Sequence, residues 1–327
     1  FTFINILCIS ALLVWVSDIP LKQTGLDKTG DFLIVKESDD SWMPMFEALK
    51  IAREEPEVPL YQAVFFEDRD KFQYPPTSLL VAGFIKRISP AEAYPHNKRY
   101  YLQGISRAFS WLFVIINAVV VWRILVLASH RSGTTLSNLV AGALLAVTLT
   151  VTFYPIAASY AFGQVQTWIN SLFAIALWCW MERRQVIAGT LIGAICLLKP
   201  QFGVIILWGM LRRQWGFAGA AAAVILAGLA VSVLIFGISS HWDYLNVLRY
   251  LSRHGETYYP NQSINGILNR LLSNGDALHS SNWFPPFHPV VYAGTLMGTV
   301  VLLGSALWRP QAGAAGTVDL AIAALST

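Results

Sequence analysis

Several apolar runs in this chain are close to twenty residues long. The length of these runs restricts the possible folds of the chain more than any other feature of its sequence. Because a helix rises about 1.5 Å per residue, a run of that length crosses the hydrocarbon core of a bilayer. Only 13% of the residues are charged, whereas soluble domains have about 25%. The sequence therefore predicts an all-α, polytopic bundle of transmembrane helices. The runs lie at about 1–17, 104–128, 135–154, 165–181, 186–198, 201–211, 216–237, 289–307 and 318–327.

No linker or repeat divides the chain, so we expect one membrane domain over residues 1–327. It starts at Phe1 within an apolar run and stops within another, and we expect both ends to be cut from a longer protein. The three cysteines all lie in apolar runs, without metal-ligand spacing. The sequence also lacks a P-loop and a dinucleotide-binding fingerprint, and it shows no Asp-x-Asp pair of the kind that would hold a metal with a nucleotide sugar. We therefore expect no metal and no cofactor.

Basic residues follow every second run, which predicts the orientation of the bundle. Arg131, Arg183, Arg212 and Arg309 are at these connections, which should be cytoplasmic. The remaining connections then face the other side of the membrane, including two long loops at 18–103 and 238–288. The lack of long soluble domains suggests a bacterial inner (plasma) membrane. The net charge of +4 comes with no basic cluster with interleaved aromatic residues, so we expect no nucleic-acid partner.

The basic connections all lie on the same side of the membrane only if the short run 76–89 does not cross it. It begins with Pro75-Pro76, and Pro is common in the first turn of a helix. We therefore predict an interfacial or re-entrant helix there. Trp42 begins a second short segment, whose apolar residues have the spacing of an amphipathic helix lying on the membrane.

Acidic residues precede this amphipathic segment, and Asp39 and Asp40 are the two next to it. They could belong to a solvated acidic loop. Alternatively, one carboxylate at the membrane surface could act as a general base toward a hydroxyl nucleophile. Partial desolvation next to Trp42 would favour that role.

A second polar group begins the run 165–181, where Gln164, Gln166 and Asn170 follow Gly163. Gln166 and Asn170 are four residues apart and share a helix face. Amides at membrane depth can bond between helices, or they can bind sugar hydroxyls.

Lys199 separates two short apolar runs, 186–198 and 201–211, and Pro200-Gln201 follows it. Since Pro interrupts a helix, we expect two short helices that meet in a polar kink. The lysine could extend to the membrane surface. It could also bind a lipid-linked phosphate together with Gln201 and the following helix N-terminus.

Two further polar segments are candidates for substrate contacts. Tyr74 precedes Pro75-Pro76, and it is either an interfacial anchor or one wall of a groove. Asn261, Gln262 and Asn265 follow a Tyr-Tyr-Pro sequence in the second long loop. Their amides could cap backbone groups or bind a ligand, and Asn261-Gln262-Ser263 is a weak glycosylation signal.

The order of these motifs resembles glycosyltransferase family 87, which contains membrane mannosyl- and arabinosyl-type transferases of the GT-C class. The resemblance extends from Asp39 to the last apolar run. The residues that carry it are Asp40, Pro59-Leu60-Tyr61, Phe72-Gln73-Tyr74-Pro75-Pro76, Gly163-Gln164-Val165-Gln166, Leu197-Leu198-Lys199-Pro200 and Asn261-Gln262-Ser263-Ile264-Asn265-Gly266.

This resemblance implies a GT-C membrane bundle, a polyprenyl-phosphate sugar donor and an inverting transfer on the extracytoplasmic face. It also implies an aspartate base in the first outer loop, which by position is Asp40, with Asp39 next and Asp31 still possible. The donated sugar would be mannose-like or another hexose or pentose, and the acceptor a lipid or a glycan. Lys199 would then stabilise the leaving phosphate, while the amides and Tyr74 would contact the substrates.

Two other functions remain open from the sequence. The polar residues could line the passage of a transporter or flippase for a polar lipid, although no matched halves are evident. The chain could also be a non-catalytic subunit that binds lipid-linked sugars, in which case Asp39 and Asp40 would be dispensable.

Overall fold

The computed structural model describes residues 40–90, 98–129, 136–259, 261–279 and 283–308, together with a few residues among the first thirty. The regular secondary structure in these segments is helical, which confirms the predicted all-α class. Its elements are α3 (Trp42–Glu54), η2 (Gln62–Glu67), η3 (Pro76–Ser78), α4 (Leu79–Ile88), α5 (Lys98–Ser129), α6 (Leu136–Thr152), α7 (Tyr154–Ala161), α8 (Gln166–Met181), α9 (Gln185–Cys196), η7 (Pro200–Phe202), α10 (Gly203–Leu211), α11 (Trp215–His254), α12 (Ile264–Leu271) and α13 (Pro289–Trp308).

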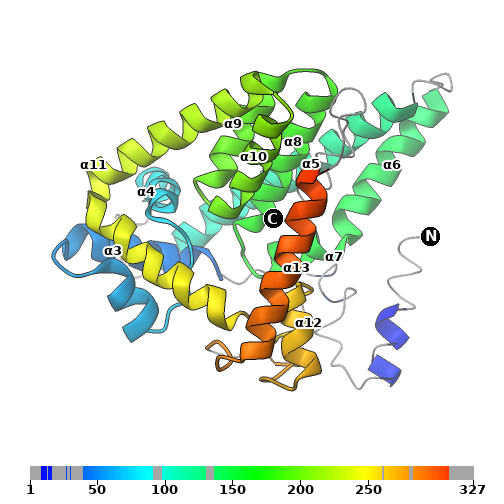
Figure 1. The fold of residues 1–327 in the computed structure, drawn as a ribbon. Helices are drawn as coiled ribbons and strands as arrows, with labels where there is room; N and C mark the ends of the chain where they lie inside the picture. The colour runs from blue at the N-terminus through cyan, green and yellow to red at the C-terminus, as the bar shows by residue number, and fades with distance from the viewer. Residues whose placement is uncertain are drawn as a thin grey trace. The chain divides into compact units, whose positions relative to one another are not determined.

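The chain forms two compact units, each built from two separate stretches of sequence. Unit 1 comprises Phe1–Met43 and Val81–Leu191, and unit 2 comprises Pro44–Leu80 and Ile192–Thr327. We describe each unit by itself below, with the element labels of Figure 1.

In unit 1, the long helix α5 packs along both α6 and α8, while α7 packs against α6 and α8 (Figure 1). Val114 of α5 lies in a buried cluster with Ile156 and Tyr160 of α7, and Trp111 packs at its edge. Apolar residues recur along α5 at helical spacing, so one side of the helix can join this core.

In unit 2, small residues allow helices to approach closely. α11 packs against α10, α13 and η3, and α12 packs against α13. A Cβ atom built on Gly193 of α9 would lie 2.6 Å from the carbonyl oxygen of Ala221 in α11. Glycine and alanine at such crossings are typical of helix pairs in membranes, where close backbone approach replaces hydrophobic burial as the source of stability.

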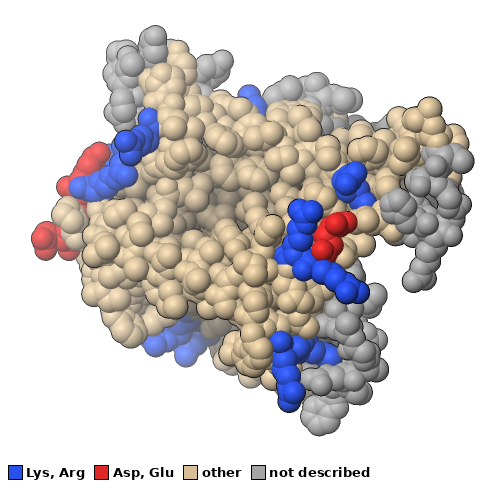
Figure 2. Space-filling view, turned by 90° about the horizontal axis from the view of Figure 1, so that it is seen from above, with Lys and Arg blue, Asp and Glu red and all other residues tan. Residues whose placement is uncertain are grey.

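Among the described residues, two helices are long and apolar enough to cross a membrane, Tyr101–Leu127 and Trp215–His254. The pair α6 and α7 makes a third candidate span if it is taken as one element bent by 53°. Figure 2 shows one face on which charged side chains occur in a few separate groups and most of the surface is uncharged. Length, hydropathy and sparse charge together identify an all-α membrane bundle.

Most predicted runs correspond to helices, but two connections differ from the prediction. The predicted connection 155–164 contains α7, which begins beside Pro155, a residue tolerated in the first turn of a helix. The second long loop, 238–288, begins with 17 residues of helix, because α11 continues to His254 after a break at Gly237 (φ 75°, ψ 158°). The sequence after Gly237 is too polar to be recognised as an apolar run, but the helix continues through it.

The two short helices predicted in the first long loop are present as α3 and as η3 with α4. The apolar side of α3 is buried within the protein, since Trp42, Met45 and Leu49 are at most 1% exposed. Their position relative to the membrane surface stays a prediction.

Candidate functional site

In unit 1, Asp40 lies against the turn that precedes α8. The Gln164 side-chain nitrogen Nε2 donates a 2.7 Å hydrogen bond to Oδ2 of Asp40. The main chain supports this contact, because the Asp40 N–H donates to the carbonyl of Phe162 over 3.0 Å and the Val165 N–H donates to Oγ of Ser41 over 3.2 Å. Asp40 itself is exposed.

The turn from α7 to α8 fixes the position of Gln164. α7 ends at Ala161, and Gly163 then adopts a left-handed conformation with φ 63°. The Gln164 N–H donates back to the carbonyl of Ser159 over 2.8 Å, which is a common way for a helix to end in glycine. This local geometry explains why Gly163 and Gln164 occur together.

The amides that follow along α8 form a second, separate contact. Nε2 of Gln166 donates to Oδ1 of Asn170 over 2.8 Å, as their four-residue spacing predicts. Trp168, between them in sequence, packs against Trp42 with ring centroids 4.8 Å apart. The start of α3 is therefore fixed to α8 both by hydrogen bonds and by an aromatic contact.

Lys199 belongs to unit 2, at the joint between α9 and α10. Its N–H donates to the carbonyl of Ile195 over 2.8 Å, and its backbone is extended (φ −137°, ψ 95°), so that Pro200 can begin η7. The predicted polar kink is thus confirmed. The side chain of Lys199 is partly buried, while Gln201 is exposed. The Thr77 hydroxyl donates to the carbonyl of Leu197, which attaches the start of η3 to this joint.

Tyr74, also in unit 2, is held through its main chain. The Tyr61 hydroxyl donates a 2.6 Å hydrogen bond to the carbonyl of Tyr74, and the Tyr244 hydroxyl donates to the carbonyl of Gln73 over 3.3 Å. Tyr61 is fully buried and stacks on Phe72 with centroids 5.2 Å apart. Burial raises the pKa of Tyr61 well above its ordinary value, so the phenol stays a neutral donor.

Asp243 fixes this arrangement from α11. Its Oδ2 accepts hydrogen bonds from the N–H groups of Tyr61 at 2.8 Å and Gln62 at 3.3 Å. The carboxylate therefore satisfies backbone donors at the start of η2, a position that favours negative charge. The sequence analysis missed Asp243, Tyr61 and Tyr244 as a group, because Asp243 lies 182 residues from Tyr61 and no local pattern connects them.

The candidate amides of the second loop in unit 2 are engaged in holding the loop. Nδ2 of Asn261 donates to the carbonyl of Glu256 over 2.7 Å, and Nε2 of Gln262 donates to the carbonyl of Tyr259. Oδ1 of Asn265 accepts from Asn269 over 2.8 Å. The contacts of Asn261 and Gln262 match the backbone-capping interpretation that the sequence left open, whereas Asn265 bonds to another side chain.

The predicted site residues are thus divided between the two units. Asp40, Gln164, Gln166 and Asn170 lie in unit 1. The predicted site residues in unit 2 are Tyr74, Lys199, Gln201, Asn261, Gln262 and Asn265. Asp31 and Asp39 lie outside the described residues. Within the described part of the chain, no group of three His, Cys, Asp or Glu side chains is arranged to hold a metal ion.

Comparison with known proteins assigns the chain to a family. The family model for glycosyltransferase family 87 matches residues 72–327, so Asp40 lies outside the matched range. An α-(1→3)-arabinofuranosyltransferase from Corynebacterium glutamicum is 24% identical over 216 residues, which make up 64% of this chain and 46% of that enzyme. The chain thus spans about half the length of this curated relative. No solved structure matches. Because the family model covers more than half of the chain, the protein belongs to glycosyltransferase family 87.

Proposed function

We propose that this membrane glycosyltransferase transfers a sugar from a polyprenyl-phosphate donor to a lipid or glycan acceptor, with inversion at the anomeric carbon. The observation that carries the proposal is the exposed Asp40 carboxylate, held by Gln164 at 2.7 Å. A carboxylate with one oxygen fixed and the other accessible is suited to remove a proton from an incoming hydroxyl group.

In the proposed reaction, the acceptor hydroxyl attacks the anomeric carbon while Asp40 takes its proton. The bond between the anomeric carbon and the phosphate oxygen breaks, and the polyprenyl phosphate leaves with the electron pair. Gln164, which the sequence analysis counted among the substrate contacts, acts in this proposal as a positioning residue, because its Nε2 already donates to the Asp40 carboxylate. Asp39 and Asp31 are alternative bases in the same loop.

Lys199 is our proposed contact for the donor phosphate. A lysine ammonium offers three donors to a phosphate whose negative charge increases as the glycosidic bond breaks. Its partly buried position at the joint before α10 limits competition from water. Gln201, Tyr74, Gln166, Asn170, Asn261, Gln262 and Asn265 are our proposed further substrate contacts.

The identity of the sugar follows less directly. The relative from Corynebacterium glutamicum is named for transfer of an arabinofuranosyl group, a pentose. We therefore propose that a pentose is as suitable for this site as a mannose-like hexose.

The proposed topology is a single membrane domain in the inner (plasma) membrane, with 18–103 and 238–288 as extracytoplasmic loops. It brings Asp40 and Lys199 to the extracytoplasmic face, opposite the arginine-rich turns. The arginines at the ends of α8 and α10 support this orientation, since basic residues favour the cytoplasmic side.

Turnover of a radiolabelled polyprenyl-phosphate sugar by the full-length protein in nanodiscs tests the proposal. We expect Asp40→Asn to reduce turnover by roughly 10²- to 10⁴-fold, the range for loss of a general base. Lys199→Ala should reduce it as well, whereas the surface variants Glu182→Gln and Lys50→Ala should retain it.

The remaining outcomes identify what is wrong. Full turnover in Asp40→Asn, together with loss of turnover in Asp39→Asn or Asp31→Asn, would assign the role of general base to Asp39 or Asp31 instead. Movement of the labelled lipid across the membrane without a new glycosidic bond would reject the transferase in favour of a flippase. Binding of the labelled lipid without either process would favour a non-catalytic subunit.

A further inference from the structure

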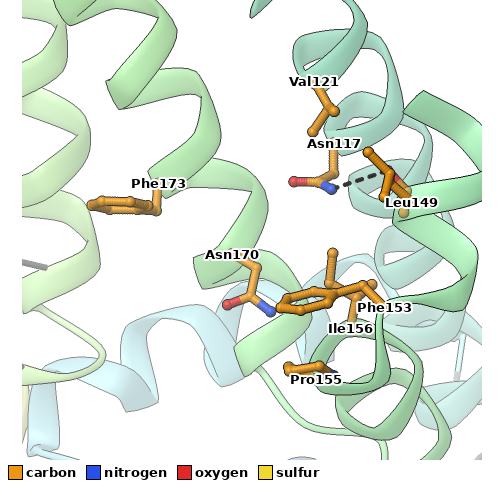
Figure 3. A pocket seen from close by; sticks show the side chains of 9 residues that line it. Asn117, Val121, Leu149, Phe153, Pro155, Ile156, Asn170 and Phe173 are labelled. Atoms are coloured by element: carbon orange, nitrogen blue, oxygen red, sulfur yellow. Dashed lines mark hydrogen bonds between the residues drawn. The ribbon is translucent and has the colours of Figure 1, made fainter. Parts of the chain in front are cut away.

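Unit 1 contains a cavity of about 380 Å³ between α5, the bend from α6 to α7, and α8 (Figure 3). Pockets of roughly 300–1,000 Å³ are typical of small-molecule sites. None of the nine lining residues is charged. They are Asn117, Val121, Leu149, Thr150, Phe153, Pro155, Ile156, Asn170 and Phe173.

The cavity occurs where one candidate span is broken. The axes of α6 and α7 differ by 53°, and Phe153 is the residue between them. A straight continuation of α6 is prevented by Pro155, which lacks a backbone donor and restricts the residue before it. The break leaves an apolar recess beside α5 and α8, and the side chain of Phe153 is 56% exposed there.

Asn117 leaves an acceptor unused in this recess. The side chain is only 5% exposed, and its Nδ2 donates a long, 3.4 Å hydrogen bond to Oγ1 of Thr150 (Figure 3). No described residue donates to its Oδ1. An amide oxygen without a partner is costly in a helix long and apolar enough to cross a membrane.

Asn170 contributes the complementary group. Its Oδ1 accepts from Gln166, while no described residue accepts a hydrogen bond from its Nδ2. The two asparagines therefore offer the cavity one unused acceptor and one unused donor, and the rest of the lining is apolar apart from Thr150. A hydroxyl group, which both donates and accepts, satisfies this pair with no charge involved.

Helix α8 lines the cavity, and the residue that binds Asp40 lies just before the start of this helix. Gln164, which binds Asp40, precedes this helix, and Asn170 lies six residues further along the chain. At about 1.5 Å per helical residue, this separation is about 9 Å, comparable to the length of one or two sugar rings. A molecule with several hydroxyl groups could thus reach Asp40 with one end and the cavity with the other.

We propose that the cavity binds the apolar portion and the innermost hydroxyl of a neutral glycolipid acceptor. The proposal rests on the proposed function and narrows the acceptor class to a lipid. A lipid phosphate would meet no cation in the cavity, and a plain hydrocarbon would leave Oδ1 of Asn117 and Nδ2 of Asn170 without a partner.

Photolabelling of the full-length protein in phosphatidylcholine nanodiscs tests this inference. The probe is an alkyl glycoside with a diazirine in its alkyl chain, and labelled peptides are mapped by mass spectrometry. We expect labelling of the peptides that contain Leu149–Ile156 and Asn170–Phe173. An excess of unlabelled alkyl glycoside should abolish it, whereas an alkyl phosphate of equal chain length should not.

Matched variants separate the two amides from the general surface. Asn117→Leu and Asn170→Leu should each weaken glycoside competition by about tenfold, the value of one lost hydrogen bond of about 1.4 kcal/mol. Asn138→Leu, on the exposed side of α6, should behave as the parent protein. Val121→Phe should fill the recess and reduce labelling, with thermal unfolding as the check that it folds.

Three outcomes would overturn the inference. Equal competition by the alkyl phosphate would indicate a site for an anionic lipid. Labelling that excess glycoside does not displace would indicate contact with bulk lipid only. Unchanged competition in both Asn→Leu variants would show that the two amides do not bind the glycoside. The readout is independent of turnover, so Asp40→Asn should still be labelled. Failure of the cavity proposal is therefore distinguishable from failure of the proposed enzyme.

Discussion

The Gln164 side chain and the Asp40 carboxylate are joined by a 2.7 Å hydrogen bond between residues 124 positions apart. Two further bonds lie on either side of it, from the Asp40 N–H to the carbonyl of Phe162 and from the Val165 N–H to the hydroxyl of Ser41. Three contacts over so short a segment fix both the place and the orientation of the carboxylate.

Removal of the Gln164 amide should therefore impair catalysis more than binding. We expect Gln164→Leu to lower kcat by roughly ten- to hundredfold through misorientation of Asp40, with KM little changed. Steady-state kinetics provide the measurement, and Gln185→Leu at the start of α9 is the control. A rise in KM at constant kcat would instead make Gln164 a substrate-binding residue.

The Asp243 carboxylate should stabilise the segment that begins at Tyr61. Asp243→Ala removes the acceptor for two backbone N–H groups, and loss of such a cap costs about 1–2 kcal/mol. The unfolding temperature in nanodiscs should fall by several degrees. Asn246→Ala removes only an exposed 3.4 Å bond to the same carboxylate and should have little effect. Equal shifts in the two variants would contradict the capping role.

The sequence was sufficient to predict the positions of most helices, since hydropathy and proline carry that information locally. It predicted the joint at Lys199, because Pro200 ends the helical pattern of α9. It missed α7 and the second half of α11, where Pro155 and Gly237 resemble the ends of helices. In the structure, Pro155 lies in the first turn of α7, and Gly237 redirects a helix that continues.

The candidate site was predictable where polar residues are close in sequence. Gln166 and Asn170 share a face by their spacing alone, and their hydrogen bond follows. The contact of Asp243 with Tyr61 depends on the tertiary fold and has no local signal. The backbone contacts of Asn261 and Gln262 were only one of two interpretations, because an amide in a loop can bind either backbone or ligand.

The crossing of α9 and α11 provides a paired test of close packing. Gly193→Ala would place a Cβ 2.6 Å from the Ala221 carbonyl oxygen and 2.9 Å from Val224 Cβ, so the helices must separate. We expect a loss of about 1–3 kcal/mol, the usual cost of overpacking. Gly219→Ala on α11 meets no atom within 4 Å and should be neutral or stabilising by up to about 1 kcal/mol.

Thermal unfolding of the two glycine variants in the same nanodiscs gives the comparison. Relative to the parent protein, the unfolding temperature should fall in Gly193→Ala and stay unchanged or rise in Gly219→Ala. Similar values for both would show that α9 and α11 can separate at this crossing without cost.

Asp70 should make stability depend on pH. Asp70 is exposed, but partial desolvation raises the pKa of its carboxyl group above the ordinary 3.8, and the nearby Asp68 and Glu47 raise it further. The folded protein therefore binds the Asp70 proton more tightly than the unfolded chain does. As the pH rises from the pKa of Asp70 in the unfolded chain to its higher pKa in the folded protein, the contribution of Asp70 lowers the free energy of unfolding. Asp70→Asn removes this loss. The variant should match the parent protein below this window and be more stable above it.

Unfolding temperatures of the parent protein, Asp70→Asn and the exposed control Glu57→Gln, measured from about pH 3 to pH 8, test this sign. Glu57→Gln should follow the parent protein throughout. A variant at Asp70 that is less stable than the parent at neutral pH would mean that the carboxylate is stabilised in the folded state, because only then does its ionisation favour folding.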